Sequence, residues 1–104
     1  MACEGAPEVR IGRKSIQSYV LAILMNLVDQ GASKVVVKAR GRNINKAVDA
    51  VEIVRNRFAK GVNIKVESCE IGSQEITTTD PQTGQTRTRR VSSIEICLVK
   101  EPAA

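Results

Sequence analysis

The chain has 104 residues, and its 16 Lys and Arg outnumber its 11 Asp and Glu, which gives a formal charge of +5. This length suits one domain with a real core, and the excess of cations favours a polyanionic partner. No apolar run approaches membrane length, and the N-terminus lacks the apolar segment of a signal peptide. We therefore expect a cytoplasmic protein without a membrane partner, with one domain at 8–100 between disordered tails at 1–7 and 101–104.

The first half of the chain predicts two strand–helix units. A short strand at Val9–Ile11 precedes a helix that begins after Ser15, where apolar residues recur at helical spacing. A run of β-branched residues marks a second strand at about 33–40. A second amphipathic helix is predicted at about 44–58.

In the second half, the apolar residues alternate with polar ones from Val62 onward, which predicts two antiparallel strands. They are joined at Asp80–Gly84, where Pro and Gly favour a turn. Between about Ile76 and Arg90 the strands carry threonines and arginines in place of core residues. We therefore expect this part to project as a two-stranded arm from an α/β protein with the order βαβαββ.

The cations cluster at the two strand-to-helix turns and in the arm. If the first two strands are parallel, as a βαβ unit favours, both turns lie at the same end of the sheet. Gly41 allows a tight turn, and Asn43 can cap a helix whose first N–H groups attract anions. A phosphate backbone is the expected anion. The predicted nucleic-acid-binding residues are Arg13, Lys14, Lys38, Arg40, Arg42, Asn43, Arg87, Arg89 and Arg90.

Plainer interpretations of these residues stay open. Lys38 and Arg40 can be solvated charges at a strand end, and the arm can be an exposed hairpin without a ligand. An RNA-binding protein acting in RNA folding or processing would use the same basic surface. The two aromatic residues, Tyr19 and Phe58, both fall on helix stripes, so base stacking on single strands is not expected.

The sequence gives no indication of a metal site, a cofactor or an enzyme. It has no His, no Cys-x-x-Cys pair, no nucleophile–base constellation and no phosphate-binding P-loop. Of the three cysteines, Cys3 lies in the expected tail. A hairpin centred on Gln82–Thr83 places Cys69 and Cys97 almost opposite each other. They are expected to be free thiols, with a disulfide between them as the alternative.

Several segments together resemble the Alba (Sac-type) chromatin proteins of archaea, over about Val9 to Lys100. These segments are Ile11–Lys14, Tyr19–Ala22, Val37–Arg42, Lys46–Asp49, Val51–Phe58, Gly72–Gln74 and Ser93–Ile96. The resemblance implies a mixed four-stranded sheet with two helices on one face and a protruding β-hairpin arm. It further implies an architectural, chromosome-associated homodimer that coats or compacts double-stranded DNA with little sequence specificity and also binds RNA.

The resemblance also implies a contact between dimers at Phe58 and higher assembly on DNA. The alternative is that Phe58 is a core residue of its helix, and a heterodimer with a paralogue is a further possibility. The family typically has two lysines after the Ile-Gly pair, where acetylation weakens DNA binding. This chain has Arg13 and then Lys14 at that place. Because arginine cannot be acetylated, Lys14 is the modification candidate.

Overall fold

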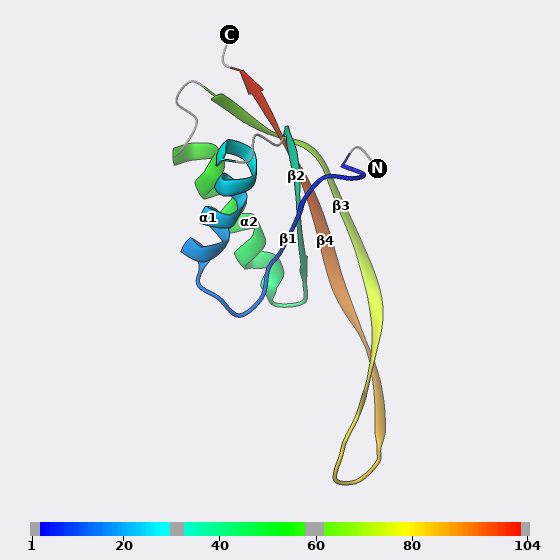
Figure 1. The fold of residues 1–104 in the computed structure, drawn as a ribbon. Coiled ribbons are helices and arrows are strands. Elements are labelled where there is room, and N and C mark those ends of the chain that lie inside the picture. The colour runs from blue at the N-terminus through cyan, green and yellow to red at the C-terminus, as the bar shows by residue number, and fades with distance from the viewer. Residues whose placement is uncertain (1–2, 30–32, 58–61, 103–104) are drawn as a thin grey trace.

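The computed structural model describes residues 3–29, 33–57 and 62–102, and its strands form one four-stranded sheet (Figure 1). The strands are β1 (Glu8–Arg10), β2 (Lys34–Arg40), β3 (Val62–Thr79) and β4 (Thr86–Pro102). The helices α1 (Ile16–Leu24) and α2 (Asn43–Arg57) lie on one face of the sheet, and a π-helical turn, η1 (Met25–Asp29), extends α1. Within the described residues, no helix is long and apolar enough to cross a membrane.

The strand order is β1-β2-β4-β3, with β1 parallel to β2 and the other two pairs antiparallel. In the register, Val37 of β2 lies between Val9 of β1 and Ile96 of β4. The mixed sheet, the helices on one of its faces and the protruding arm were expected from the sequence, and the structure confirms them.

The core fills the space between the sheet and the two helices. Its largest fully buried side chains include Ile23, Leu27, Val54 and Leu98. Residues alternate between the faces of a strand, so Val35 and Val37 of β2 join this core while Val36 points to the other face. We call these the helix face and the open face of the sheet.

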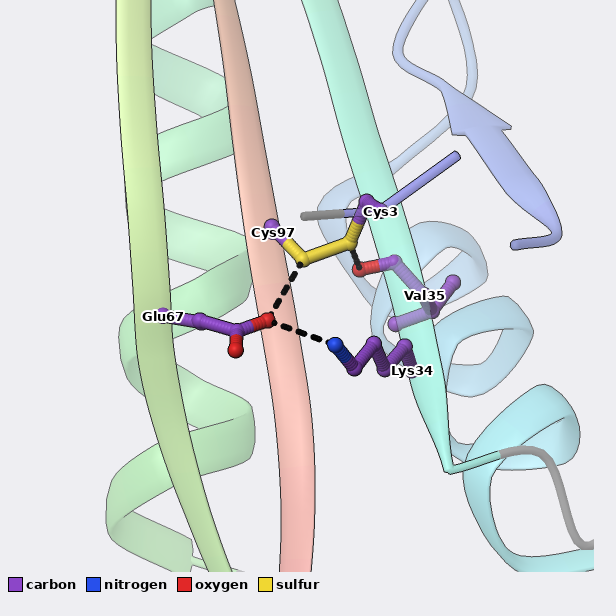
Figure 2. The surroundings of a disulfide bond; sticks show 5 residues. All are labelled: Cys3, Lys34, Val35, Glu67 and Cys97. Atoms are coloured by element: carbon purple, nitrogen blue, oxygen red, sulfur yellow. Dashed lines mark hydrogen bonds and ion pairs between the residues drawn. A yellow bond between two sulfur atoms is a disulfide. The ribbon is translucent and has the colours of Figure 1, made fainter. Parts of the chain in front are cut away.

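The N-terminal segment covers part of the open face. Cys3 is buried there and forms a disulfide with Cys97 of β4, with a Cα–Cα distance of 5.8 Å (Figure 2). The Val36 N–H donates to the Pro7 carbonyl at 2.9 Å. Residues 3–7 are thus not the disordered tail that the sequence predicts, because a covalent bond and a backbone hydrogen bond fix them to the sheet.

The expectation of two free thiols holds for Cys69 and is wrong for Cys97, and the alternative disulfide between these two residues is wrong as well. Cys69 lies opposite Ile96, whereas Cys97 lies opposite Ser68. A shift of one residue turns a side chain to the other face of a sheet. Cys69 is therefore an exposed free thiol on the helix face, and Cys97 reaches Cys3 on the open face.

Beyond the body, β3 and β4 continue as a twisted two-stranded arm, and the chain as a whole measures 59 × 27 × 20 Å (Figure 1). At its tip, the Gln82 N–H donates to the Asp80 carboxylate at 2.8 Å, which lowers the pKa of Asp80. Gly84 has a φ of 71°, a conformation that suits glycine. The turn expected at Asp80–Gly84 is therefore present.

Candidate nucleic-acid interface

Both strand-to-helix turns leave the same end of the sheet, the end from which the arm projects (Figure 1). At the second turn, Gly41 has a φ of 57°, and its N–H donates to the Ser92 carbonyl at 2.8 Å. This hydrogen bond fixes the turn to β4. The N-terminus of α2 at Asn43 therefore lies at this same end of the sheet, which we call the basic end, and the Ile44 N–H of its first turn donates to the Gly41 carbonyl at 3.1 Å.

Three of the predicted ligands at this end are free to bind an anion. Arg13, Lys14 and Arg42 are exposed, and within the described residues their side chains make no hydrogen bond or ion pair. Two turns distant in sequence thus contribute unpaired charges at one end of the sheet. Exposed cations without a carboxylate partner are those that gain most from a phosphate.

A groove of about 490 Å³ lies beside these charges. It is lined by Arg13 from the first turn, by Arg10 and Arg40 from the strand ends and by Asn43 from α2. Arg40 donates to the side-chain oxygen of Gln74 on β3 at 3.3 Å. Sequence reasoning did not include Gln74 among the site residues, because a single glutamine in a strand carries no specific signal.

Lys38 differs from the other predicted ligands because two carboxylates hold it. Its ammonium lies 2.8 Å from Glu8 and 3.4 Å from Glu95. The hydrogen bond with Glu8 raises the pKa of Lys38 and lowers the pKa of Glu8. The charge of Lys38 is therefore compensated locally, which supports its plainer interpretation as a strand-end charge.

The three arginines of the arm do not lie together. Arg87 lies opposite Thr78 and Arg89 opposite Ile76, so their side chains share the open face with Arg40. Arg90 points to the helix face and is paired with Glu75 at 3.3 Å. The open face thus carries basic residues from the groove into the arm, and Arg90 stands apart.

The loop between β1 and α1 is held by two residues that the sequence did not identify as part of the site. The hydroxyl of Tyr19 accepts hydrogen bonds from the N–H groups of Gly12 and Lys14. The ammonium of Lys46 donates to the carbonyls of the same two residues. Helical spacing predicts only that Tyr19 is buried, so this role had no signal in the sequence.

One other expectation is not tested by the structure. Phe58, the candidate for contact between dimers, lies outside the described residues. Within the described part of the chain, no three His, Cys, Asp or Glu side chains group closely enough to hold a metal ion.

The fold and this basic end define a small α+β protein with a cationic groove and a cationic arm. Comparison with known proteins identifies its family, because the Alba family model matches residues 7–73. The chain is 53% identical over 95 residues to the DNA/RNA-binding protein Alba of Nanoarchaeum equitans, covering 91% of this chain and 99% of that one. The chain therefore belongs to the Alba family, and the resemblance seen in the sequence is confirmed.

Solved structures agree with this assignment. Alba from Thermoplasma volcanium is similar with a TM-score of 0.68 and 37% identity, covering 88% of this chain and 98% of that chain. ALBA1 from Trypanosoma brucei is similar with a TM-score of 0.57 and 28% identity, covering 89% and 68% of the two chains. The α+β fold described above is thus the fold of its relatives.

Proposed function

We propose that this Alba-family chain is an architectural chromatin protein that binds double-stranded DNA through phosphate contacts, with little sequence specificity, and coats or compacts it. The observation that carries the proposal is the set of three unpaired cations, Arg13, Lys14 and Arg42, at one end of the sheet. Cations and backbone N–H groups recognise phosphates, which are the same in every sequence. The role is not enzymatic, and it would place the protein on the chromosome.

RNA is a second ligand of the same surface, because its backbone presents the same phosphates. The relative from Nanoarchaeum equitans carries both nucleic acids in its name, DNA/RNA-binding protein Alba. An RNA-binding role in folding or processing is therefore the alternative to the chromatin role. Parallel titrations with duplex DNA, duplex RNA and single strands separate the two, since an RNA-binding role requires tighter binding to RNA at equal salt.

The active unit in this proposal is a homodimer. On the helix face, β3 carries Val66, Cys69 and Ile71, opposite residues of β4 that are buried, yet all three are exposed. Ile71 is 84% exposed. A second copy would cover this apolar row, and two-fold symmetry is the usual way in which such a surface closes. The proposal extends to higher assembly on DNA, with Phe58 as the contact between dimers, and to pairing with a paralogue.

Lys14 is the proposed modification site. Its side chain is exposed, and within the described residues no carboxylate pairs with it. Acetylation would remove its charge and weaken phosphate binding, whereas the neighbouring Arg13 would keep its charge.

The test reverses one of the free charges. Arg42→Glu should weaken affinity for duplex DNA roughly tenfold or more, because a phosphate ligand becomes a repelling charge. The melting temperature should stay close to that of the wild type, since an exposed substitution shifts stability by about 0.5 kcal/mol or less. Fluorescence anisotropy with a labelled duplex measures the affinity.

Arg55→Glu is the matched control, with the same change in net charge. Arg55 is also exposed and lies on α2, about 18 Å along the helix from Asn43. Its guanidinium is 2.9 Å from Glu52, so it already has a carboxylate partner. Equal losses in both variants would show that only net charge matters, and no loss in Arg42→Glu would remove this turn from the mechanism.

A further inference from the structure

Four hydrogen bonds tie the loop that carries Arg13 to the two helices. The Tyr19 hydroxyl on α1 accepts the Gly12 N–H at 2.7 Å and the Lys14 N–H at 3.0 Å. The Lys46 ammonium on α2 donates to the Gly12 carbonyl at 2.7 Å and to the Lys14 carbonyl at 3.0 Å. Both backbone groups of the residues that flank Arg13 are therefore occupied.

The parts of this arrangement fit closely. Tyr19 is only 8% exposed, so its hydroxyl position is set by packing in the core. The Lys46 ammonium also lies 5.8 Å from the centre of the Tyr19 ring, where a cation is attracted to the ring face. A Cβ atom at position 12 would lie 3.3 Å from the hydroxyl, so glycine leaves room for this approach.

From this geometry we propose that Tyr19 and Lys46 are positioning residues for the nucleic-acid interface, and that Lys46 acts on the loop and not on phosphate. This inference rests on the proposed function. Lys46 lies in the first turn of α2, close in sequence to Arg42 and Asn43. Its bonds to Gly12 and Lys14 therefore hold the two cationic turns at a fixed distance from each other.

Fixing the turns favours binding because the entropy of ordering them is lost during folding and not on contact with DNA. This saving in entropy on binding is largest for Arg13. Its neighbours are held on both sides, whereas its own side chain is exposed and has no partner within the described residues. The Lys46 ammonium has three N–H donors, and two of them are used by the loop carbonyls.

The first test uses the wild-type protein alone. Amide hydrogen exchange should be slow at Gly12 and Lys14, whose N–H groups are bonded to Tyr19. Arg13 is the internal control, because within the described residues its N–H makes no hydrogen bond, and it should exchange at least tenfold faster. Equal exchange rates at all three amides would show that the hydrogen bonds from the loop to Tyr19 are not formed, whether or not the protein binds DNA.

The second test separates positioning from phosphate binding by salt dependence. Lys46→Met and Lys14→Met each remove one positive charge while keeping an unbranched side chain. Lys14→Met should lower the slope of log affinity against log salt by about 0.9 for each phosphate that the variant no longer neutralises. Lys46→Met should weaken affinity at every salt concentration and leave the slope unchanged. A lower slope in Lys46→Met would show that Lys46 binds phosphate and would overturn the proposal.

Tyr19→Phe completes the test without any change in charge. Loss of the hydroxyl should weaken DNA affinity about fivefold to tenfold, with the salt slope preserved. The reason is that the loop would lose the stabilisation of its hydrogen bonds to Tyr19 and would have to be ordered on binding to DNA. It should also accelerate exchange at Gly12 and Lys14. If the wild type binds DNA with the expected dependence on salt and Tyr19→Phe binds equally well, the positioning role is refuted and the proposed function stands. A wild type without salt-dependent binding would instead refute the proposed function.

Discussion

Ion pairing divides the basic side chains of this chain into two groups. Lys38 and Arg90 are tied to carboxylates, whereas Arg13, Lys14 and Arg42 have no such partner within the described residues. All five look alike in the sequence. Lys38 and Arg90 lie in strands, where the register places Glu95 and Glu75 opposite them. The other three lie in turns, where no neighbouring strand of the described sheet brings a carboxylate opposite them.

The disulfide is a feature of single residues with a large expected effect on stability. Cys3→Ser should lower the free energy of unfolding by about 2–5 kcal/mol, because a bond between residues 94 apart restricts the unfolded chain. Denaturant unfolding without reductant measures the change.

Cys69→Ser is the control for that substitution. Cys69 is an exposed free thiol, so its replacement should leave stability within about 0.5 kcal/mol of the wild type. Titration of the unfolded, unreduced protein should find one reactive thiol. Three reactive thiols, or equal stability of the two variants, would contradict the Cys3–Cys97 bond.

Among the elements, those with a clear period were predicted well. The structure gives α2 as Asn43–Arg57 and β2 as Lys34–Arg40, each within two residues of the expected bounds. The N-terminal segment was missed because Ala, Gly and Pro give no period, and its place depends on a bond to Cys97 at the far end of the chain. Local patterns do not encode such long-range contacts.

The arm supplies the prediction at this scale. A double variant, Arg87→Gln with Arg89→Gln, should weaken duplex DNA binding clearly more than Arg90→Gln does. The reason is that Arg87 and Arg89 share the open face with Arg40, whereas Arg90 is paired with Glu75 on the other face. Arginines in an extended arm suit the negative potential of a narrow minor groove.

Anisotropy titrations at a fixed salt concentration compare these variants, and thermal melts confirm that each stays folded. Because the double variant removes two charges and Arg90→Gln removes one, Arg87→Gln alone is measured as the charge-matched partner of Arg90→Gln. If Arg90→Gln weakens binding as much as Arg87→Gln, the arm does not bind DNA through one face.

At the scale of the molecule, the fold could be predicted further than the site. The order of the elements along the chain, the parallel pairing of β1 with β2 and the arm were predicted from periodicity and from the geometry of βαβ units. The hydrogen bonds that hold the loop between β1 and α1 depend instead on where the Tyr19 hydroxyl and the Lys46 ammonium lie once the helices are packed. Tyr19 on a helix stripe is indistinguishable from any buried tyrosine until α1 and α2 are placed together.

Assembly gives the prediction for the whole molecule. Ile71→Glu should convert the proposed homodimer to a monomer, because it places a charge in the exposed apolar row of β3. Sedimentation at micromolar concentration measures the mass, and Thr77→Glu on the arm serves as a control of equal charge. A wild type that sediments as a monomer would refute the dimer, and a dimeric Ile71→Glu would refute this interface.

The central claim is that the basic end binds phosphates without reading bases. It is tested most directly by measuring the affinity of the wild type for several duplexes of unrelated sequence across a range of salt concentrations. We expect log affinity to fall linearly with log salt, with a slope near −0.9 for each phosphate neutralised, and to differ little between sequences. A flat response to salt, or a strong preference for one duplex, would contradict the account.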